Sequence, residues 1–240
     1  MMAGTIQNRE KFLNNIASNL GRKPRLSGVE RPSYKFQPQH EVLKDKTTDE
    51  LLEIMKEHCT KIHTDYYQTN SENLVHTLKA AIDYFGGGPI TITKDERFEE
   101  FGIADLLKKE LPNEGHPLHE WNPDGDVDNM ALAEKSNVGI TFSELTLAES
   151  ATVLLLSSKE KGRAVSLLPK TYIAIIPKST IVPRITQAAK YLRDSVQRGE
   201  LVPSSINFVS GPSYSADIEM ILVVGVHGPV KAAYIVVEDK

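Results

Sequence analysis

The sequence predicts an α/β protein whose main domain is built on a mixed, mostly parallel β-sheet, preceded by an N-terminal helical arm. Between residues 47 and 121, short β-branched or apolar runs alternate with segments whose apolar residues recur at helical spacing. This alternation is typical of a parallel sheet covered by helices. Between residues 138 and 176, three apolar β runs follow one another without a helical pattern between them. Two of these connections are therefore expected to be antiparallel.

The arm is expected to span residues 1–46. A helix is predicted over residues 9–20, with Asn8 as its N-cap, because apolar residues recur on one face and Gly21 follows. Residues 22–46 contain three prolines and seven lysines or arginines, which predicts a basic linker. A solvated arm is the simplest interpretation of this charge. A basic clamp over an acidic partner or a neighbouring subunit is the alternative.

The main domain is expected to span residues 47–240 and to begin with a helix. Thr47 and Glu50 have the spacing of a capping box. The apolar stripe of this helix consists of Leu51, Leu52, Met55 and Cys59. The elements predicted next are a strand at 62–67, a helix from Asn70 or Ser71 to the glycines at 86–88, a strand at 89–93, a helix at 98–111 and an extended segment at 116–121.

The second half of the domain is predicted to be rich in strands. Pro183 is expected to be the first residue of a helix that ends at Gly199, because proline is tolerated in the first helical turn. The inward face of this helix is predicted to carry Ile185, Ala188, Ala189, Leu192 and Val196. The predicted strands are 138–142, 152–156, 172–176, 206–210, 220–226 and 232–237.

Composition limits the classes of partner. The chain has 28 Lys and Arg against 32 Asp and Glu, a formal net charge of −4, so nothing in the charge balance favours nucleic acid or an anionic membrane. No apolar run approaches the roughly 20 residues needed to span a bilayer. The N-terminus lacks a basic-then-apolar signal pattern. The protein is therefore expected in the cytoplasm, without membrane insertion.

A single cysteine, Cys59, limits redox chemistry within this chain. One cysteine forms no internal disulfide, and an iron–sulfur cluster needs about four cysteine ligands. If the protein takes part in electron transfer, the redox centre must therefore lie on a partner or on a diffusible cofactor. Cys59 follows Leu51 and Met55 at helical spacing, which predicts a small core residue.

Several common catalytic and cofactor motifs are missing from the sequence. It contains no P-loop pattern, no G-x-G-x-x-G after a strand, no H-E-x-x-H and no G-x-S-x-G. The acidic residues at 124, 126 and 128 alternate as in a calcium loop, but the expected glutamate is absent. We therefore predict a polar turn there and no metal site.

The segment from residue 210 to 229 is the first candidate for a site. A strand runs into Gly211 and Pro212, and a short helix is expected to follow, with Asp217 and Glu219 in its first turns. Free backbone N–H groups at such a junction, together with the hydroxyls of Ser213 and Ser215, would form a cradle for a small anion. Gly211 would allow a ligand to approach the backbone closely.

His227 and Gly228 extend this candidate, because they follow an apolar run directly. A histidine held between glycines could orient an anion or move a proton near neutral pH. The structural alternative is that Ser213 only caps a helix and His227 only satisfies a turn.

A second candidate lies at residues 139–143 and 148–152. We expect Thr141, Ser143 and Arg163 to bind a ligand. Glu149 falls just before an apolar run, where a carboxylate is costly unless it is paired. Arg163 could pair with Glu149 or with a substrate carboxylate. A structural ion pair is the alternative.

These stretches together resemble the lactate-utilisation (LUD) domain family. The resemblance rests on GIT at 139–141 with AESAT at 148–152, on Arg163 followed by Leu168-Pro169, and on GPSYSADIE at 211–219 with GVHGP at 225–229. It covers roughly residues 47–240, and an N-terminal helical arm fits one subgroup of the family. Two positions depart from the family pattern: Ser150-Ala151 replaces Thr-Gly, and Ser215 replaces Thr.

The resemblance implies a three-layer α/β/α fold, similar to the ribose-phosphate isomerase and CoA-transferase superfamily. It also implies work with two iron–sulfur partner proteins that oxidise L-lactate to pyruvate, with no cluster bound by this chain alone. Two alternatives stay open. The protein could be an independent enzyme acting on a small acid or sugar phosphate, with Glu149 or His227 as acid or base, or it could be a non-catalytic structural or regulatory module.

Overall fold

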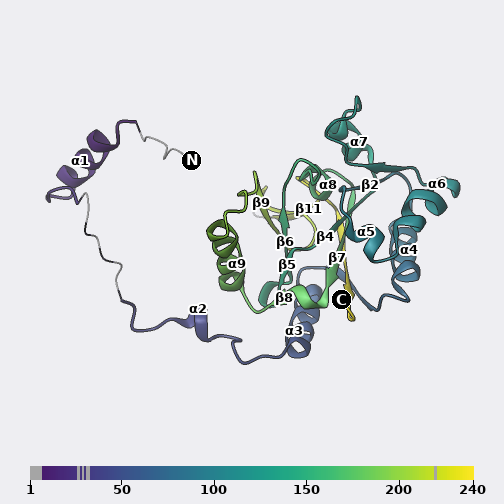
Figure 1. The fold of residues 1–240 in the computed structure, drawn as a ribbon, viewed down its shortest axis with the longest axis horizontal. Helices are drawn as coiled ribbons and strands as arrows, with labels where there is room; N and C mark the ends of the chain where they lie inside the picture. The colour runs from purple at the N-terminus through teal and green to yellow at the C-terminus, as the bar shows by residue number, and fades with distance from the viewer. Residues whose placement is uncertain (1–6, 26–27, 29, 31–32, 219–220) are drawn as a thin grey trace. The chain divides into compact units, whose positions relative to one another are not determined.

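The computed structural model (Figure 1) describes residues 7–25, 28, 30, 33–218 and 221–240. The chain divides into two compact units, Met1–Pro38 and Gln39–Lys240, and each is described by itself.

The first unit contains the helix predicted at residues 9–20, which is confirmed as α1 (Arg9–Asn19). The N-cap prediction is wrong, because Asn8 has a left-handed backbone with φ of 59° and its side chain makes no capping hydrogen bond. A capping side chain works from an extended backbone. Most of the apolar stripe is exposed, with Phe12 at 65% and Leu20 at 61%, whereas Ala17 is buried.

The capped helix predicted from residue 47 is present in the second unit. A single turn, α2 (Pro38–Glu41), lies within the segment expected to be linker. α3 (Thr48–Lys61) then starts with the capping box, in which the Glu50 N–H donates to the Thr47 hydroxyl at 3.3 Å and the Thr47 N–H donates to the Glu50 carboxylate at 2.8 Å. The predicted stripe of this helix is buried, including Cys59.

Six parallel strands form the central sheet, in the order β1–β12–β7–β4–β2–β3. β7 and β12 are interior strands and are buried along almost their whole length, which agrees with their unbroken apolar runs. The bounds are β1 Thr64–Thr69, β2 Ile90–Ile92, β3 Leu118–Glu120, β4 Val138–Phe142, β7 Thr171–Pro177 and β12 Lys231–Val237.

Helices cover both faces of this sheet, which confirms the α/β/α fold class (Figure 1). One face is covered by α4 (Leu74–Tyr84), α5 (Arg97–Glu100), the π-helical turn η1 (Leu106–Glu110) and α6 (Leu111–Asn113). The other face is covered by α3 and α8 (Ala164–Leu167), with α7 (Asn129–Lys135) beside α8. A Cβ added to Gly139 would lie 2.0 Å from the Val165 carbonyl oxygen. Glycine at this position therefore lets α8 lie directly on β4.

The single helix predicted at residues 98–111 is wrong, because the segment is divided into α5, η1 and α6. Gly102 follows α5 with φ of 70°, a conformation that ends a helical turn. The apolar residues of this segment are nevertheless buried as expected, among them Phe98, Leu106 and Leu107. No helix in the described part of the chain is both long and apolar enough to cross a membrane.

The antiparallel connections expected among the runs 138–142, 152–156 and 172–176 are wrong, because the first and third run pair parallel as β4 and β7. The middle run belongs to a second, four-stranded sheet, which contains antiparallel pairs. Its order is β8–β5–β6–β9, with β5–β6 and β6–β9 antiparallel and β5–β8 parallel. Its strands are β5 Leu145–Leu147, β6 Thr152–Leu156, β8 Ile181–Val182 and β9 Ile206–Val209. The chain thus leaves the central sheet after β4 and returns to it at β7. The short 3-10 turn η2 (Ala148–Ser150) lies on this excursion, whereas η3 (Lys178–Thr180) connects β7 to β8.

α9 (Ile185–Gln197) lies against this second sheet, two residues later than predicted. Pro183 precedes the helix, and Arg184 occupies its N-cap. Of the apolar residues predicted on this helix, Ala188 is buried, whereas Ile185 and Val196 are each 53% exposed. The end at Gly199 is confirmed by its φ of 80°.

The short helix predicted after Ser213 is also wrong, because this segment forms a two-stranded hairpin. β10 (Tyr214–Ile218) pairs antiparallel with β11 (Ile221–Val224), with Tyr214 opposite Val224. Small polar residues alternate with larger ones through this stretch, a period that suits a strand. Glu219 and Met220 lie outside the described residues.

Gly211 connects β9 to this hairpin and ties it to the central sheet. Its N–H donates to the Tyr234 hydroxyl at 2.9 Å, and that hydroxyl donates to the Val209 carbonyl at 3.1 Å. Burial raises the pKa of Tyr234, so the hydroxyl stays protonated and keeps both bonds. The glycine has φ of 67°, and a Cβ added to it would lie 2.8 Å from the Ile62 carbonyl oxygen.

Replacement of Gly211 by alanine is expected to destabilise the protein more than the same change at Gly102. Both glycines have positive φ, so both variants incur a cost of about 1–2 kcal/mol. Gly102 has open space around it, whereas Gly211 faces fixed backbone, which adds about 1–3 kcal/mol of overpacking. Urea unfolding of the two variants measures this difference. Equal losses of stability would show that the close approach at Gly211 carries no energy.

Candidate functional site

The topology places a crevice at the carboxyl ends of β2 and β4. After β2 the chain enters α5, which covers one face of the sheet, and after β4 it enters the second sheet, which lies on the other face. β2 and β4 are neighbours in the sheet. Neighbouring parallel strands whose connections leave in opposite directions mark the usual ligand site of open α/β sheets.

A small pocket occupies this crevice. It is lined by Thr93, Asp95, Thr141, Phe142, Glu144, Leu155, Leu156, Ser157, Lys161, Gly162, Arg163, Ser166 and Asn207. Its cavity volume is about 20 Å³, and one water molecule needs about 10–15 Å³. The pocket therefore has room for a small group such as a carboxylate.

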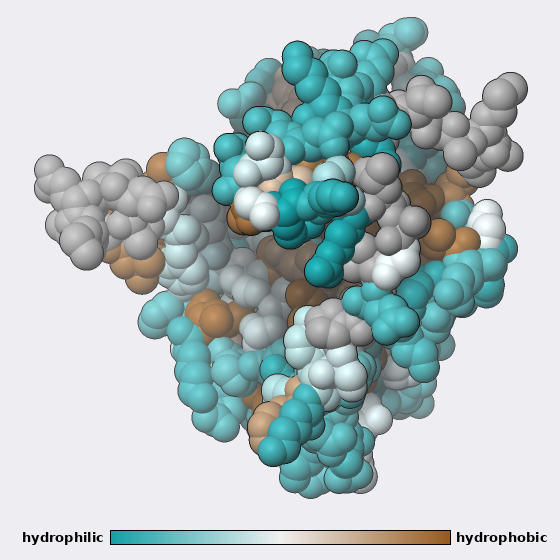
Figure 2. Space-filling view, turned by 90° about the vertical axis from the view of Figure 1, so that its left-hand side faces the viewer, coloured by the Kyte–Doolittle hydropathy of each residue, from teal (hydrophilic) through white to brown (hydrophobic). Residues whose placement is uncertain are grey.

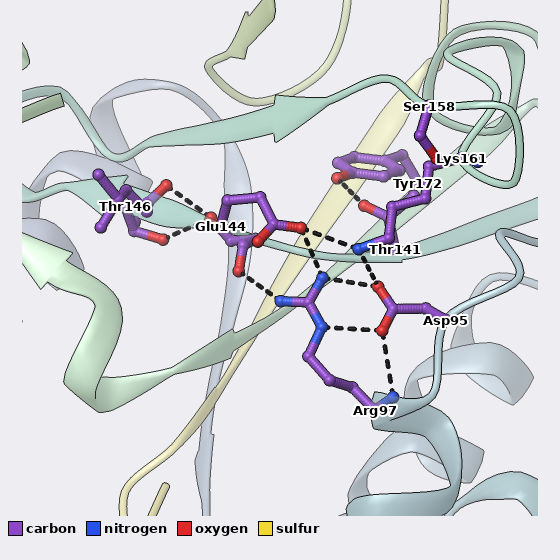
Figure 3. Close-up of polar contacts among 10 residues, drawn as sticks. Asp95, Arg97, Thr141, Glu144, Thr146, Ser158, Lys161 and Tyr172 are labelled. Atoms are coloured by element: carbon purple, nitrogen blue, oxygen red, sulfur yellow. Dashed lines mark hydrogen bonds and ion pairs between the residues drawn. The ribbon is translucent and has the colours of Figure 1, made fainter. Parts of the chain in front are cut away.

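One wall of the pocket is a network of four charged side chains (Figure 3). Arg97 donates to both carboxylate oxygens of Asp95, at 2.9 and 2.6 Å, and to Glu144 at 2.7 Å. Lys161 lies 2.7 Å from Asp95 and 3.0 Å from Glu144. Each carboxylate thus contacts both cations, and the four charges compensate one another.

The network holds the Asp95 carboxylate in the ionised form. Burial by itself would raise the pKa of Asp95, but the hydrogen bonds from Arg97 and Lys161 outweigh it and lower that pKa to about 2. Arg97 also lies over the ring of Phe142, at 4.9 Å from its centroid, and donates to the Ser143 carbonyl at 3.2 Å. Its guanidinium therefore bridges the loops that follow β2 and β4.

Two lining groups are available to a ligand. Arg163 is exposed, and its guanidinium has no hydrogen-bond or ion-pair partner in the described part of the chain. Thr93 is only 5% exposed, yet among the described residues its hydroxyl has no hydrogen-bond partner either. Thr141 lies beside them, with its hydroxyl 2.7 Å from that of the buried Tyr172. A cation and two hydroxyls thus face one small space.

The structure brings together two of the three ligand-binding residues predicted in this region. Thr141 and Arg163 line the same pocket, although they are 22 positions apart in the sequence. Ser143 does not line it: its hydroxyl donates to the Leu145 carbonyl at 2.6 Å and accepts from Thr146 at 2.9 Å. Ser143 therefore shapes the turn between β4 and β5.

The pairing suggested between Glu149 and Arg163 is wrong, because Glu149 pairs with Arg184 at 2.6 Å. The turn η2 carries Glu149 to the start of α9, where its N–H donates to the Pro183 carbonyl at 3.2 Å. Pairing satisfies the carboxylate, as its position before a buried strand requires. Arg163 is thereby left for the pocket.

A row of hydroxyls links the two sequence blocks that carried the family resemblance. Thr152 Oγ1 lies 2.7 Å from Ser150 Oγ and 2.6 Å from Ser210 Oγ. Ser150 and Thr152 belong to the AESAT block, and Ser210 directly precedes Gly211. These blocks therefore meet at the amino end of β6, whereas Ser157 and the pocket lie at its carboxyl end.

The anion cradle predicted at residues 211–228 does not form in the expected way, because its backbone is a hairpin and offers no helix N-terminus. The Ser213 N–H donates to the Pro229 carbonyl at 2.8 Å, and the Ser213 carbonyl accepts from the Gly225 N–H at 2.9 Å. A Cβ added to Gly228 would lie 3.1 Å from that of Ser213. These glycines thus serve the close packing of the hairpin base.

The polar residues of this segment are spread along the hairpin. Ser215 lies in β10 opposite Val223, and the backbone of Asp217 belongs to the same strand. His227 is exposed in the turn that follows β11. Neither Ser215 nor His227 lines the pocket at the ends of β2 and β4.

Sequence reasoning missed most of the polar wall of the pocket. Thr93 and Asp95 directly follow a short buried strand, and polar residues after a parallel strand mark the edge of the sheet where ligands bind. That signal was present in the sequence. Lys161, Ser166 and Asn207 carry no comparable signal, because their place in the pocket depends on how the second sheet folds.

Comparison with known proteins gives a consistent family. A family model described as the LUD domain matches residues 52–237. Proteins named Lactate utilization protein C are 56% identical in Bacillus subtilis (strain 168) and 54% identical in Geobacillus thermodenitrificans (strain NG80-2), each over 240 residues and 100% of both chains. The protein of that name from Oceanobacillus iheyensis is 49% identical over 233 residues, which cover 97% of this chain and 99% of the relative.

A solved structure has the same fold. The crystal structure of a DUF162 family protein from Deinococcus radiodurans is similar with a TM-score of 0.57 and 19% sequence identity, covering 80% of this chain and 99% of that chain. At this identity the likeness concerns the fold alone.

Replacement of Asp95 by asparagine is expected to lower the free energy of unfolding near pH 7 by about 1–2 kcal/mol, once the pKa shift is discounted for solvent screening. The pKa of Asp95 in the folded protein, about 2, lies below its ordinary value of 3.8. The stabilisation is therefore fully present above about pH 4 and is lost as the pH falls towards 2.

Unfolding of the wild type and of Asp95→Asn between pH 7 and pH 3 measures this effect. The difference between them should stay constant down to about pH 5 and shrink below pH 4. Asp105→Asn is the control, since the Asp105 carboxylate is 74% exposed in its pair with Lys109. A difference for Asp95→Asn that does not change with pH would contradict the role assigned to its charge.

Ala151 stands where the family pattern has glycine, and its φ of 46° is left-handed. Ala151→Gly should therefore be more stable than Ala148→Gly by about 1–2 kcal/mol. Both alanines are fully buried in the same turn, so both variants lose one methyl group and gain the same chain flexibility. Only Ala151 is released from a strained backbone. Thermal unfolding of both variants tests this, and equal stabilities would contradict it.

Proposed function

Because the chain belongs to the LUD-domain family, we propose that it acts in lactate utilisation, as the component without an iron–sulfur cluster in a system that oxidises L-lactate to pyruvate. The relatives named Lactate utilization protein C support this role, since they are 49–56% identical over nearly the whole chain. The N-terminal arm is included in that similarity.

The redox centres are assigned to two iron–sulfur partner proteins. Oxidation of L-lactate to pyruvate removes two electrons and two protons, so it needs an electron acceptor. The single cysteine of this chain is fully buried, and burial raises its pKa to about 12. A buried thiol of that kind is a poor source of the thiolate that ligates iron. This supports a division of labour in which the clusters lie on the partners.

The contribution of this chain is to bind a small 2-hydroxy or 2-oxo carboxylate in the pocket at the ends of β2 and β4. This proposal rests on the guanidinium of Arg163, which has no hydrogen-bond or ion-pair partner among the described residues. It can therefore pair with a carboxylate that enters the pocket. The hydroxyls of Thr93 and Thr141 suit the substituent at C2. Phe142, Leu155 and Leu156 supply an apolar lining for the methyl group.

The charge network supports a carboxylate ligand in a further way. Asp95 and Glu144 are both paired with Arg97 and Lys161, so neither carboxylate confronts the ligand with an uncompensated charge. Arg163 then provides the local excess of positive charge. A charge-assisted hydrogen bond of this type contributes about 1.5–3 kcal/mol.

Replacement of Arg163 by glutamine is expected to weaken L-lactate binding by about 10- to 100-fold, which corresponds to that free energy. Titration calorimetry of the purified chain with L-lactate and with pyruvate measures the change. Arg193→Gln is the matched control, because Arg193 is likewise exposed on the second unit but does not line the pocket. Equal affinities of Arg163→Gln and the wild type would refute the assignment of the pocket.

A growth experiment tests the biological role separately. Deletion of the gene should stop growth on L-lactate and leave growth on pyruvate intact, and Arg193→Gln should restore it where Arg163→Gln does not. Normal growth on L-lactate without this chain, and with no second copy of the gene, would overturn the role in lactate utilisation. Restoration by Arg163→Gln would instead leave that role standing and reject the pocket.

A further inference from the structure

β9 forms an open edge of the second sheet. Its partner β6 lies on one side, with Leu155 opposite Asn207 and Val153 opposite Val209. The Ser157 N–H donates to the Ser205 carbonyl at 3.0 Å. This bond indicates which residues of β9 form backbone hydrogen bonds with β6. Alternate residues of an antiparallel strand face its partner, so residues 205, 207 and 209 turn their backbone groups towards β6.

The backbone groups of Ile206 and Phe208 therefore point away from the sheet. Within the described residues, neither makes a backbone hydrogen bond outside the strand ladder. Their side chains are exposed as well, by 37% and 41%. An edge with unpaired N–H and C=O groups and exposed apolar side chains is a template for another strand.

The other edges of the two larger sheets are protected, and β9 is not. β1 carries Asp65, β3 ends at Glu120, and β8 has only two residues before Pro183. These are the usual devices that keep edges apart. By contrast, residues 201–216, which contain all of β9, include no charged side chain.

The surroundings of β9 are apolar too. Leu201 is 89% exposed and Val202 63%, and on α9 the side chains of Ile185 and Val196 are each 53% exposed. Figure 2, which faces the left-hand side of Figure 1, shows a mostly hydrophilic surface with small apolar patches. Pairing along β9 would remove such side chains from water.

We propose that β9 pairs antiparallel with β9 of a second copy of this chain, about a two-fold axis at Asn207. Ile206 then exchanges both backbone hydrogen bonds with the partner's Phe208, and Phe208 does the same with the partner's Ile206. The side chains of the two Asn207 residues lie next to each other across the axis.

Lack of charge is the reason for choosing a second copy as the partner. A two-fold contact brings the groups near the axis close to their own copies in the second chain. Charged residues at those positions would therefore repel one another. The segment around β9 is free of this penalty, whereas β1 and β3 are not. Asn207 also lines the pocket at the ends of β2 and β4, so the second copy lies beside that pocket, whatever ligand the pocket holds.

Sedimentation equilibrium of the full chain tests the proposal. The wild type should have the mass of a dimer at micromolar concentration. Phe208→Lys should raise the dissociation constant at least 100-fold, because each lysine would lie opposite the partner's Ile206 and diagonally across the axis from the second lysine. Met130→Lys is the control, since Met130 is 53% exposed and lies on α7. It should remain a dimer. A monomeric wild type overturns the proposal, even if another protein covers this edge.

A cross-link tests the geometry without disturbing the fold. Directly opposed residues that do not exchange hydrogen bonds have Cα atoms about 4.5 Å apart, which is within the range of a disulfide. Asn207→Cys should therefore form a covalent dimer on mild oxidation, since the native Cys59 is buried. Glu72→Cys, at an exposed position after β1, should stay monomeric on a non-reducing gel. Failure of Asn207→Cys to cross-link faster than Glu72→Cys would reject the two-fold axis.

Discussion

The arrangement of the site depends on the ion pairs among Asp95, Arg97, Glu144 and Lys161. These residues come from the loops after three different strands, β2, β4 and β6. Arg97 and Lys161 each bridge both carboxylates, so the network joins the two sheets at one point. Removal of the Asp95 charge alone is expected to lower the free energy of unfolding by about 1–2 kcal/mol, because the two cations lose a shared partner. Such a network makes the relative position of the loops specific, and that position defines the pocket.

The pocket is formed by the excursion of the chain from the central sheet. Between β4 and β7 the chain forms β5 and β6 of the second sheet, and Leu155 and Ser157 on this excursion close the crevice over Thr141. Without this excursion, the carboxyl ends of β2 and β4 would open directly to solvent. Residues that are apolar, cationic and hydroxyl-bearing therefore meet in a space of carboxylate size. Binding in such a partly enclosed space strengthens each polar contact, because water screens it less.

The regular elements were predictable from sequence wherever one local signal was sufficient. Residues that are neighbours in the sequence determine the capping box at Thr47 and Glu50 and the buried strands β4, β7 and β12. The helix expected after Ser213 failed because small polar residues suit both a helix start and a strand, and pairing with β11 decided between them. The partner of Glu149 could not be found locally, since it depends on where η2 places the start of α9. Lys161 was missed for the same reason: it lies 66 positions from Asp95, and only the tertiary fold joins them.

The proposed dimer and the proposed ligand site share Asn207, and this has a thermodynamic consequence. Asn207 contacts Ser157 through its amide and accepts from Ser205, and its strand forms the open edge. A ligand that orders this end of β9 lowers the entropy lost when the edge pairs, and pairing lowers the entropy lost when the ligand binds. Any such coupling must be reciprocal, so lactate would tighten the dimer by the factor by which the dimer tightens lactate binding. Formation of the dimer would thus change the ligand affinity of the pocket through one strand, without a large conformational change.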